Sequence, residues 1–166
     1  MGNKQGIFYY WNEKGYGILE DLLIRFPNAV AIFDAQGDLR KPRELAEKYP
    51  GRIKFAWYGG DRLGGELVRW KEESSDDIII DRNRMIQHLI DEFTLGNRIH
   101  LYGSEPEWEQ YWQHFKAIYR VVEENEKTLR KRFIWRRNGD DHLVHCTNYW
   151  RAGIYLLGES GQGGFI

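Results

Sequence analysis

The apolar run at residues 29–33 ends in a carboxylate, Asp34. An uninterrupted run of this length is typical of a strand that is buried on both faces, although a buried helical turn has the same pattern. In open α/β sheets the ligand crevice lies beyond the carboxyl ends of the strands, so a carboxylate at such an end is well placed for chemistry. An Asp that follows a strand is also a common turn residue. The position therefore makes Asp34 a candidate ligand without excluding a turn.

A second acidic group, Asp140 and Asp141, lies more than a hundred positions later, at the start of the last predicted helix. Asp is a favoured N-cap and is stabilised by the positive end of the helix dipole, so one of the two is expected to cap the helix. The other carboxylate is then available for a ligand. A step of four residues along a helix returns to the same face, so His145 presents a nitrogen donor beside Asp141. A solvated helix end with a surface histidine explains the same residues equally well.

These side chains together suggest a site for Mg²⁺ or Mn²⁺. Both are hard cations that prefer carboxylate oxygens, with water and phosphate oxygens completing the shell. Two such ions about 4 Å apart stabilise the attacking and the leaving oxygens in phosphodiester cleavage. Because this mechanism needs carboxylates from different elements, Asp34 and Asp141 are the predicted catalytic residues. Asp140 and His145 complete the predicted set of metal ligands.

Cationic residues are interleaved with aromatic ones shortly before the last helix, and Arg82 begins an earlier helix. Cationic side chains beside aromatic ones can follow a nucleic-acid backbone. The alternative is a solvated hairpin whose charge is balanced by Glu123, Glu124 and Glu126, with Arg82 a surface charge next to a helix cap. The predicted DNA-binding residues are Arg130, Lys131, Arg132, Arg136, Arg137 and Arg82.

The hydrophobic pattern predicts one mixed α/β domain that holds these candidates. Helices are predicted where apolar residues recur every three or four positions, and strands where short β-branched or aromatic runs are bounded by turn residues. The predicted helices are residues 18–26, 42–48, 85–93, 104–118 and 140–157. The predicted strands are residues 7–11, 29–34, 53–57, 78–80, 99–102, 119–122 and 133–135. The domain is expected to cover residues 1–157, followed by a flexible tail at 158–166.

Size and composition exclude several other classes of protein. A chain of 166 residues is most simply one domain, since domains commonly run to about 100–150 residues. The net charge of −1 argues neither for nor against a nucleic-acid ligand. The single cysteine, Cys146, excludes an internal disulfide framework and fits a reducing compartment. No apolar stretch approaches the roughly 18 residues of a membrane span, and no signal-peptide core is present, so we expect a soluble intracellular protein with no membrane partner.

The order of these motifs resembles the C-terminal nuclease domain of phage terminase large subunits, over most of the chain. The residues that carry the resemblance are the helix at 17–26, the strand ending at Asp34, Ile78-Ile79-Ile80-Asp81-Arg82 with its helix, Gly96-Asn97-Arg98-Ile99, and Asp140-Asp141-His142 leading to Asn148-Tyr149-Trp150. The resemblance implies an RNase H-like fold, in which a mixed sheet is flanked by helices. It also implies cleavage of concatemeric viral DNA during packaging, with two divalent metal ions held by acidic residues. Asp34 matches the Asp of the family's second motif, and Asp141 matches the Asp of the Asp-His motif.

Two positions depart from the family's pattern. Many members carry a further Asp one turn into the last helix, where this chain has His145. The family's first catalytic Asp lies on the first strand, whereas this chain begins Met1-Gly2-Asn3-Lys4-Gln5-Gly6 and has no acidic residue before Glu13. We therefore expect a truncated copy that lacks the ATPase motor, binds metal weakly, and cleaves DNA poorly or not at all.

Two other functions stay open at this point. A non-catalytic α/β module of the same fold would contribute only DNA or protein contacts. A flavodoxin-like nucleotide-binding domain is less consistent, because no glycine-rich loop follows the first predicted strand and the glycines at 59–65 lack the Lys-Ser/Thr of a P-loop. The nuclease interpretation implies double-stranded DNA as a ligand and a terminase ATPase domain, a small terminase subunit or a portal as partners. It also implies a phage or prophage protein in the cytoplasm of a bacterial host.

Overall fold

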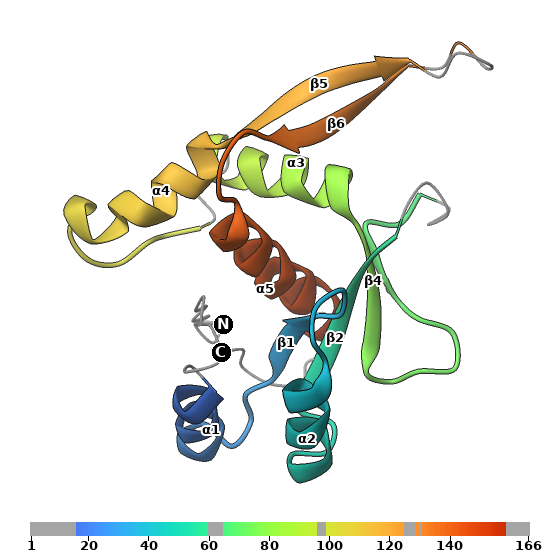
Figure 1. Ribbon diagram of the computed structural model, residues 1–166, viewed down its shortest axis with the longest axis vertical. Coiled ribbons are helices and arrows are strands. Elements are labelled where there is room, and N and C mark those ends of the chain that lie inside the picture. The colour runs from blue at the N-terminus through green and yellow to red at the C-terminus, as the bar shows by residue number, and fades with distance from the viewer. Residues whose placement is uncertain (1–15, 60–64, 96–98, 125–128, 130, 159–166) are drawn as a thin grey trace.

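The described part of the chain forms a four-stranded mixed sheet with helices on both faces, and a separate two-stranded hairpin (Figure 1). The computed structural model describes residues 16–59, 65–95, 99–124, 129 and 131–158. The predicted fold class, an α/β domain with a mixed sheet flanked by helices, is confirmed, and the arrangement is compatible with an RNase H-like fold.

The helices and strands alternate along most of the chain. The helices are α1 Tyr16–Arg25, α2 Arg40–Lys48, α3 Arg82–Thr94, the 3₁₀ helix η2 Glu105–Trp108, α4 Glu109–Lys116 and α5 His142–Gly158. The strands are β1 Ala31–Asp34, β2 Ile53–Gly59, β3 Val68–Trp70, β4 Asp77–Asp81, β5 Ile118–Glu124 and β6 Lys131–Arg137. None of the helices in the described ranges is both long enough and apolar enough to cross a membrane.

The sheet has the strand order β1-β2-β4-β3, with β1, β2 and β4 parallel and β3 antiparallel to β4. Successive side chains of a strand point to opposite faces of the sheet. Ala31 and Phe33 of β1 therefore share one face, on which they pack with α1 and α2. Ile32 points to the other face, where it packs against the core that includes α5.

Two apolar cores lie on the two faces of this sheet. On one face, Leu19 and Leu23 of α1 pack with Leu45 of α2 against β1 and β2. On the other face, α3 and α5 contribute Met85 and Ala152 to a core that contains the buried side chains of β4. Helix α5 is thus the layer that covers the sheet on its second face (Figure 1).

A third core joins α3, α4 and α5 to the base of the hairpin. Its buried members are Ile86, Leu89, Tyr111, Phe115, Ile118 and Val144. Strand β6 is also tied to the start of α3 by two hydrogen bonds. The backbone N–H of Trp135 donates to Asn83 Oδ1 at 2.8 Å, and Arg82 Nη1 donates to the carbonyl of Trp135 at 2.7 Å. The hairpin base therefore has a fixed position relative to α5.

Most predicted elements are present, and four details were wrong or missed. Residues 99–102 form no strand, because Ile99 and Leu101 pack against the third core instead of pairing with a neighbouring strand. Strand β3 was not predicted. The predicted helix at 104–118 begins as the 3₁₀ turn η2, and the last helix begins at His142 rather than Asp140. The predicted strand at 7–11 and residues 159–166 of the predicted tail lie outside the described residues.

The third core gives a stability prediction. Leu89→Ala should lower the free energy of unfolding by about 2–5 kcal/mol, because it leaves a cavity between fully buried side chains. Leu95→Ala removes the same atoms from a side chain that is 84% exposed, so we expect a change within about 0.5 kcal/mol. Urea denaturation followed by circular dichroism measures both variants. Equal losses would contradict this assignment of the core.

Candidate functional site

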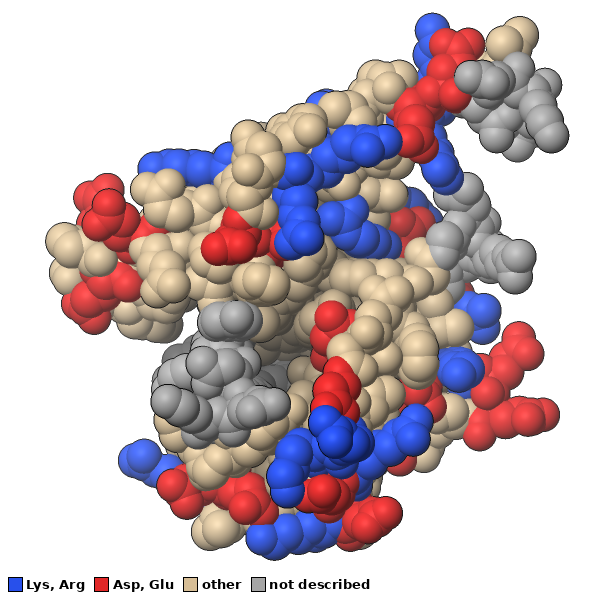
Figure 2. Space-filling model, in the orientation of Figure 1, with Lys and Arg blue, Asp and Glu red and all other residues tan. Residues whose placement is uncertain are grey.

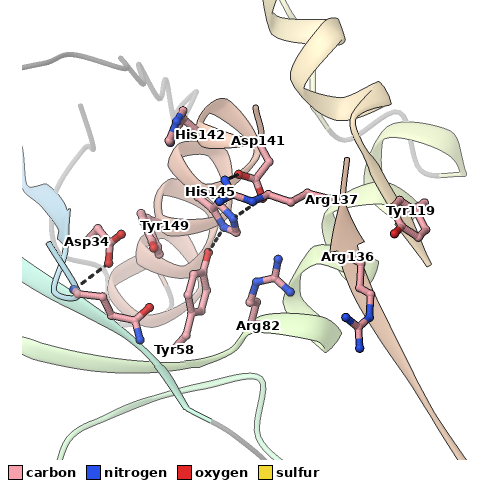
Figure 3. Close-up of a pocket in the computed structure, with 11 residues that line it drawn as sticks. Asp34, Tyr58, Arg82, Tyr119, Arg136, Arg137, Asp141, His142, His145 and Tyr149 are labelled. Carbon is pink, nitrogen blue, oxygen red and sulfur yellow. Dashed lines mark hydrogen bonds and ion pairs between the residues drawn. The ribbon is translucent and has the colours of Figure 1, made fainter. Parts of the chain in front are cut away.

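A pocket of about 720 Å³ lies where β1 and β2 end, beside the first turns of α5 and the end of β6. Its walls contain both acidic candidates, Asp34 and Asp141, and three arginines, Arg82, Arg136 and Arg137. Figure 3 shows Asp34 at one end of the pocket and Arg136 with Tyr119 at the other, with Tyr58, Tyr149 and the pair Arg137 and Asp141 between them. In Figure 2, Lys and Arg side chains gather on the rim that carries the base of the hairpin.

Simple periodicities bring the pocket residues together. Asp34 lies two residues after Ile32 on β1, and Tyr58 lies two residues after Ala56 on β2, so both point to the α5 face of the sheet. Asp141 immediately precedes α5. Steps of four residues along the helix place His145 and Tyr149 on the same side as Asp141, the side that faces the sheet. The two candidate carboxylates therefore lie on the same face of the sheet.

Asp141 is the buried carboxylate of the site, with only 2% of its surface exposed. Its backbone carbonyl accepts the first helical hydrogen bonds of α5, from Val144 at 3.0 Å and His145 at 3.3 Å. Its carboxylate has two polar partners, of which Arg137 is charged. Arg137 Nη1 donates to Oδ1 at 2.9 Å, and His145 Nε2 lies 3.0 Å from Oδ2. Both carboxylate oxygens therefore already have a partner.

The contact to His145 continues into a chain of hydrogen bonds. Tyr58 Oη lies 2.6 Å from His145 Nδ1, and Asn148 Nδ2 donates to Tyr58 Oη at 3.2 Å (Figure 3). An ionised carboxylate only accepts hydrogen bonds, so His145 Nε2 carries a hydrogen. The Nδ1 atom of the neutral ring then accepts from the Tyr58 hydroxyl. The chain thus has one consistent direction, from Asn148 through Tyr58 and His145 to Asp141.

The pKa values of these groups agree with that direction. Burial lowers the pKa of His145 and outweighs the opposing effect of the Asp141 charge, so the imidazole is neutral near pH 7. Burial raises the pKa of Asp141, but the contacts with His145 and Arg137 lower it more, and the carboxyl stays ionised. Burial also raises the pKa of the Tyr58 hydroxyl, which therefore remains a donor.

Asp34 is in a different environment, because it is exposed. Its Oδ1 accepts a hydrogen bond from the backbone N–H of Gln36 at 2.9 Å. This is the turn interaction that Asp commonly makes two residues ahead of itself. Asp34 is thus a turn residue that also lines the pocket.

The structure brings together some of the predicted site residues and separates others. Asp34, Asp141 and His145 line the same pocket, as do Arg82, Arg136 and Arg137. Asp140 does not: it is exposed and lines a second pocket of about 770 Å³, together with Glu107 and Glu109. Because Asp140 belongs to another surface, the prediction that it is a metal ligand of the Asp34 site finds no geometric support.

The predicted DNA-binding residues lie along β6 and at the start of α3. Lys131 and Arg132 lie further out on the hairpin. Lys131 Nζ is 3.6 Å from Glu124 Oε2, and Arg132 Nη2 is 3.0 Å from Glu123 Oε2. Arg136 also contacts Glu123, at 2.9 Å. Arg130 lies outside the described residues. The predicted pairing of basic with acidic side chains on the hairpin is therefore present, and Glu123 pairs with both Arg132 and Arg136.

Sequence reasoning missed Tyr58, Asn148 and Tyr149 as parts of the site. One signal for Tyr58 was available, since it follows the predicted strand at 53–57 as Asp34 follows its own apolar run. The helical period that linked Asp141 to His145 also leads to Tyr149, four residues further on. Asn148 had no comparable signal, because its role depends on the position of the Tyr58 hydroxyl.

The donor groups, as arranged here, do not form a two-ion metal centre. Among the described residues, no group of three or more His, Cys, Asp or Glu side chains is placed to hold a metal ion. Asp141 is held by Arg137 and His145 through both oxygens, and Asp34 accepts from the backbone of its own turn. A divalent cation would have to displace at least one of these contacts.

Comparison of the chain with models of known protein families, with curated proteins and with solved structures gave no match. The functional argument therefore depends on the residues and geometry of the pocket.

The hydrogen-bond chain predicts how His145 responds to pH. Its imidazole should titrate below the ordinary value of 6.5, with the hydrogen on Nε2 at pH 7. Because the unfolded chain binds this proton more readily than the folded chain, the His145 contribution to stability is complete above pH 6.5 and decreases as the pH falls below it. Two-dimensional ¹H–¹⁵N NMR of the imidazoles, assigned with His145→Gln, measures the midpoint and the tautomer. A midpoint above 6.5 would contradict the account.

Proposed function

We propose that this chain is a nuclease-type domain of a phage terminase large subunit, with duplex DNA as its ligand, and that it cleaves DNA slowly. The observation that supports this most is that Asp34 and Asp141 line one pocket on one face of the sheet. The sequence resemblance assigns the metal-ligand roles to these same two residues. They are more than a hundred positions apart, and placement on opposite faces of the sheet would have separated them.

The arginines of the pocket support DNA as the ligand. Guanidinium groups bind phosphate oxygens through charged hydrogen bonds, and such contacts position a protein on the DNA backbone. Arg136 already donates a hydrogen bond to the Glu123 carboxylate, and Arg82 donates one to the carbonyl of Trp135. A guanidinium has five N–H donors, however, so each can hold a phosphate as well. We propose that the backbone crosses the pocket mouth and continues along β6.

The proposed cofactor is Mg²⁺ or Mn²⁺, held weakly. Carboxylate oxygens are the ligands that these cations prefer, and the pocket offers them from Asp34 and Asp141. Because both Asp141 oxygens already have partners, a cation competes with Arg137 or His145 for the carboxylate. A cation that must compete for its ligand is bound at only a fraction of the sites, and we therefore propose that cleavage is slow.

The resemblance also suggests the setting of this activity. We propose a terminase ATPase domain, a small terminase subunit or a portal as partners during DNA packaging. The corresponding location is the cytoplasm of a bacterial host.

The second candidate function is a non-catalytic module that contributes only DNA or protein contacts. The observation that favours it is the occupied carboxylate of Asp141, which Arg137 and His145 hold in place. The two candidates differ in one property, metal-dependent cleavage.

The DNA-binding proposal is tested with matched lysine substitutions. Lys131→Ala should weaken binding to every duplex sequence and reduce the slope of log K against log salt by about 1, because one phosphate contact is lost. Lys41→Ala is the control, since Lys41 is an exposed lysine on α2 that also pairs with a nearby glutamate, Glu44. Fluorescence anisotropy with a labelled duplex at several salt concentrations measures both. Equal effects of the two substitutions would contradict a DNA surface on β6.

The cleavage proposal is tested with supercoiled plasmid and Mn²⁺. The unchanged chain should nick the plasmid slowly, and Asp34→Asn should abolish that nicking, because a carboxylate ligand is lost. Asp38→Asn is the control, since Asp38 is an exposed loop residue that pairs with Arg40 and does not line the pocket. No nicking by the unchanged chain would support the non-catalytic candidate. Efficient cutting would contradict the proposal of weak activity.

A further inference from the structure

The strands β5 and β6 form an arm that is fixed at its base and extends away from the rest of the domain. At the base, Ile118 and Trp135 pack into the third core. Further out, the two strands pass the start of α3 and continue beyond it (Figure 1). The side chains at 122, 124 and 131–133 are exposed. The outer part of the arm is therefore accessible to a ligand.

The arm has a charge opposite to that of the rest of the chain. Its two strands contain five basic side chains and two acidic ones, a net charge of +3. The whole chain has a net charge of −1, so the residues outside the two strands together carry −4. Positive charge concentrated on one projecting element attracts a polyanion and directs it to that element. The charge therefore favours nucleic acid as the ligand of the arm.

The arm also carries an exposed apolar patch among these charges. Phe133 is 59% exposed, and Val122, directly opposite on β5, is 56% exposed. Opposite residues of an antiparallel pair lie on the same face, so the two side chains form one patch. Lys131 lies two residues from Phe133 and therefore points to the same face. An aromatic ring and a cation are thus presented together to solvent.

A chain of contacts from α3 holds the Phe133 ring. The guanidinium of Arg120 lies over the ring, with its central carbon 4.5 Å from the ring centroid. Arg120 Nη1 donates to Gln87 Oε1 at 2.9 Å, and Gln87 Nε2 donates to Asp91 Oδ1 at 2.8 Å. Because the guanidinium covers one face of the ring, a flat ligand can stack only on the other face. The ring is therefore oriented before a ligand arrives.

We propose that Phe133 stacks on an unpaired base of the bound DNA, so that the arm recognises a place where the duplex is locally open. Stacking on an aromatic side chain suits any base, because every base has a π-face, and Arg120 adds a cation to the stack. An unpaired base turns outward at the least cost, whereas a paired base must first leave its stack. Lys131 contacts a phosphate beside that base. This inference rests on the proposed DNA ligand and adds the form of DNA that the domain prefers.

The first test compares two labelled duplexes of the same sequence, one fully paired and one with a single unpaired adenine at its centre. Fluorescence anisotropy is measured in EDTA, because the inference involves no metal ion. The unchanged chain should bind the duplex with the unpaired adenine about tenfold more tightly, a factor within the range found for one base stacked on an aromatic side chain. Phe133→Leu should bind both duplexes equally, because it keeps an apolar side chain but has no ring. Phe133→Tyr should retain the preference.

Phe26→Leu is the matched control for loss of an exposed phenylalanine. Phe26 is 39% exposed, and the Arg25 guanidinium lies 5.5 Å from its ring centroid. It follows α1 and does not belong to the arm, so Phe26→Leu should leave the preference for the unpaired adenine within about twofold. Circular dichroism checks that the variants are folded.

The second test uses only the unchanged chain, so it does not depend on how any variant folds. An abasic nucleotide replaces the unpaired adenine, which keeps the extra phosphate and the local flexibility of the duplex but removes the base. The tenfold preference over the paired duplex should disappear, since nothing remains to stack on Phe133.

The outcomes separate this inference from the proposed function. Equal, salt-dependent binding of the paired duplex and the duplex with an unpaired adenine would overturn the inference and leave DNA as the ligand. A preference that survives in Phe133→Leu or with the abasic nucleotide would also overturn it, because the preference would then come from the flexibility of the duplex. No binding to either duplex would overturn both the inference and the proposed DNA ligand, and would favour a protein as the ligand of the patch.

Discussion

Burial of the Asp141 carboxylate is the constraint on which the rest of this site depends. A carboxylate removed from water is strongly destabilising unless charged or hydrogen-bonding groups compensate it. Here the compensation comes from two directions: Arg137 at the end of β6, and His145 one turn along α5. The position of the hairpin relative to α5 is therefore part of the chemistry. The third core, which joins the hairpin base to α3, α4 and α5, fixes that position.

The same constraint determines what the pocket can do. The carboxylates of Asp34 and Asp141 share a pocket, but they differ in environment, since one is exposed and the other is buried between two partners. A hard cation finds its preferred type of ligand there, yet it meets a positive group already in place. The proposal of slow cleavage depends on this competition between a cation and Arg137 for the Asp141 carboxylate.

Much of this arrangement could be predicted from local patterns. The period of a strand placed Asp34 at a strand end, and the period of a helix placed His145 beside Asp141, because both depend only on neighbouring residues. The choice between Asp140 and Asp141 could not be made, since either can cap a helix and only the packed structure shows which one faces the pocket. The contact from Arg137 was also beyond sequence reasoning, because it depends on where the hairpin ends relative to α5. Strand β3 was missed because three residues are too few to show an alternating pattern.

The most direct test of the central claim is a crystal structure of the chain with a short duplex and Mn²⁺, with the ion located by its anomalous scattering. The proposed function predicts a peak within coordination distance of Asp34 and Asp141, with the duplex against the arginines of the pocket. A structure in which the duplex lies elsewhere on the surface, and no ion lies near the two carboxylates, would contradict it.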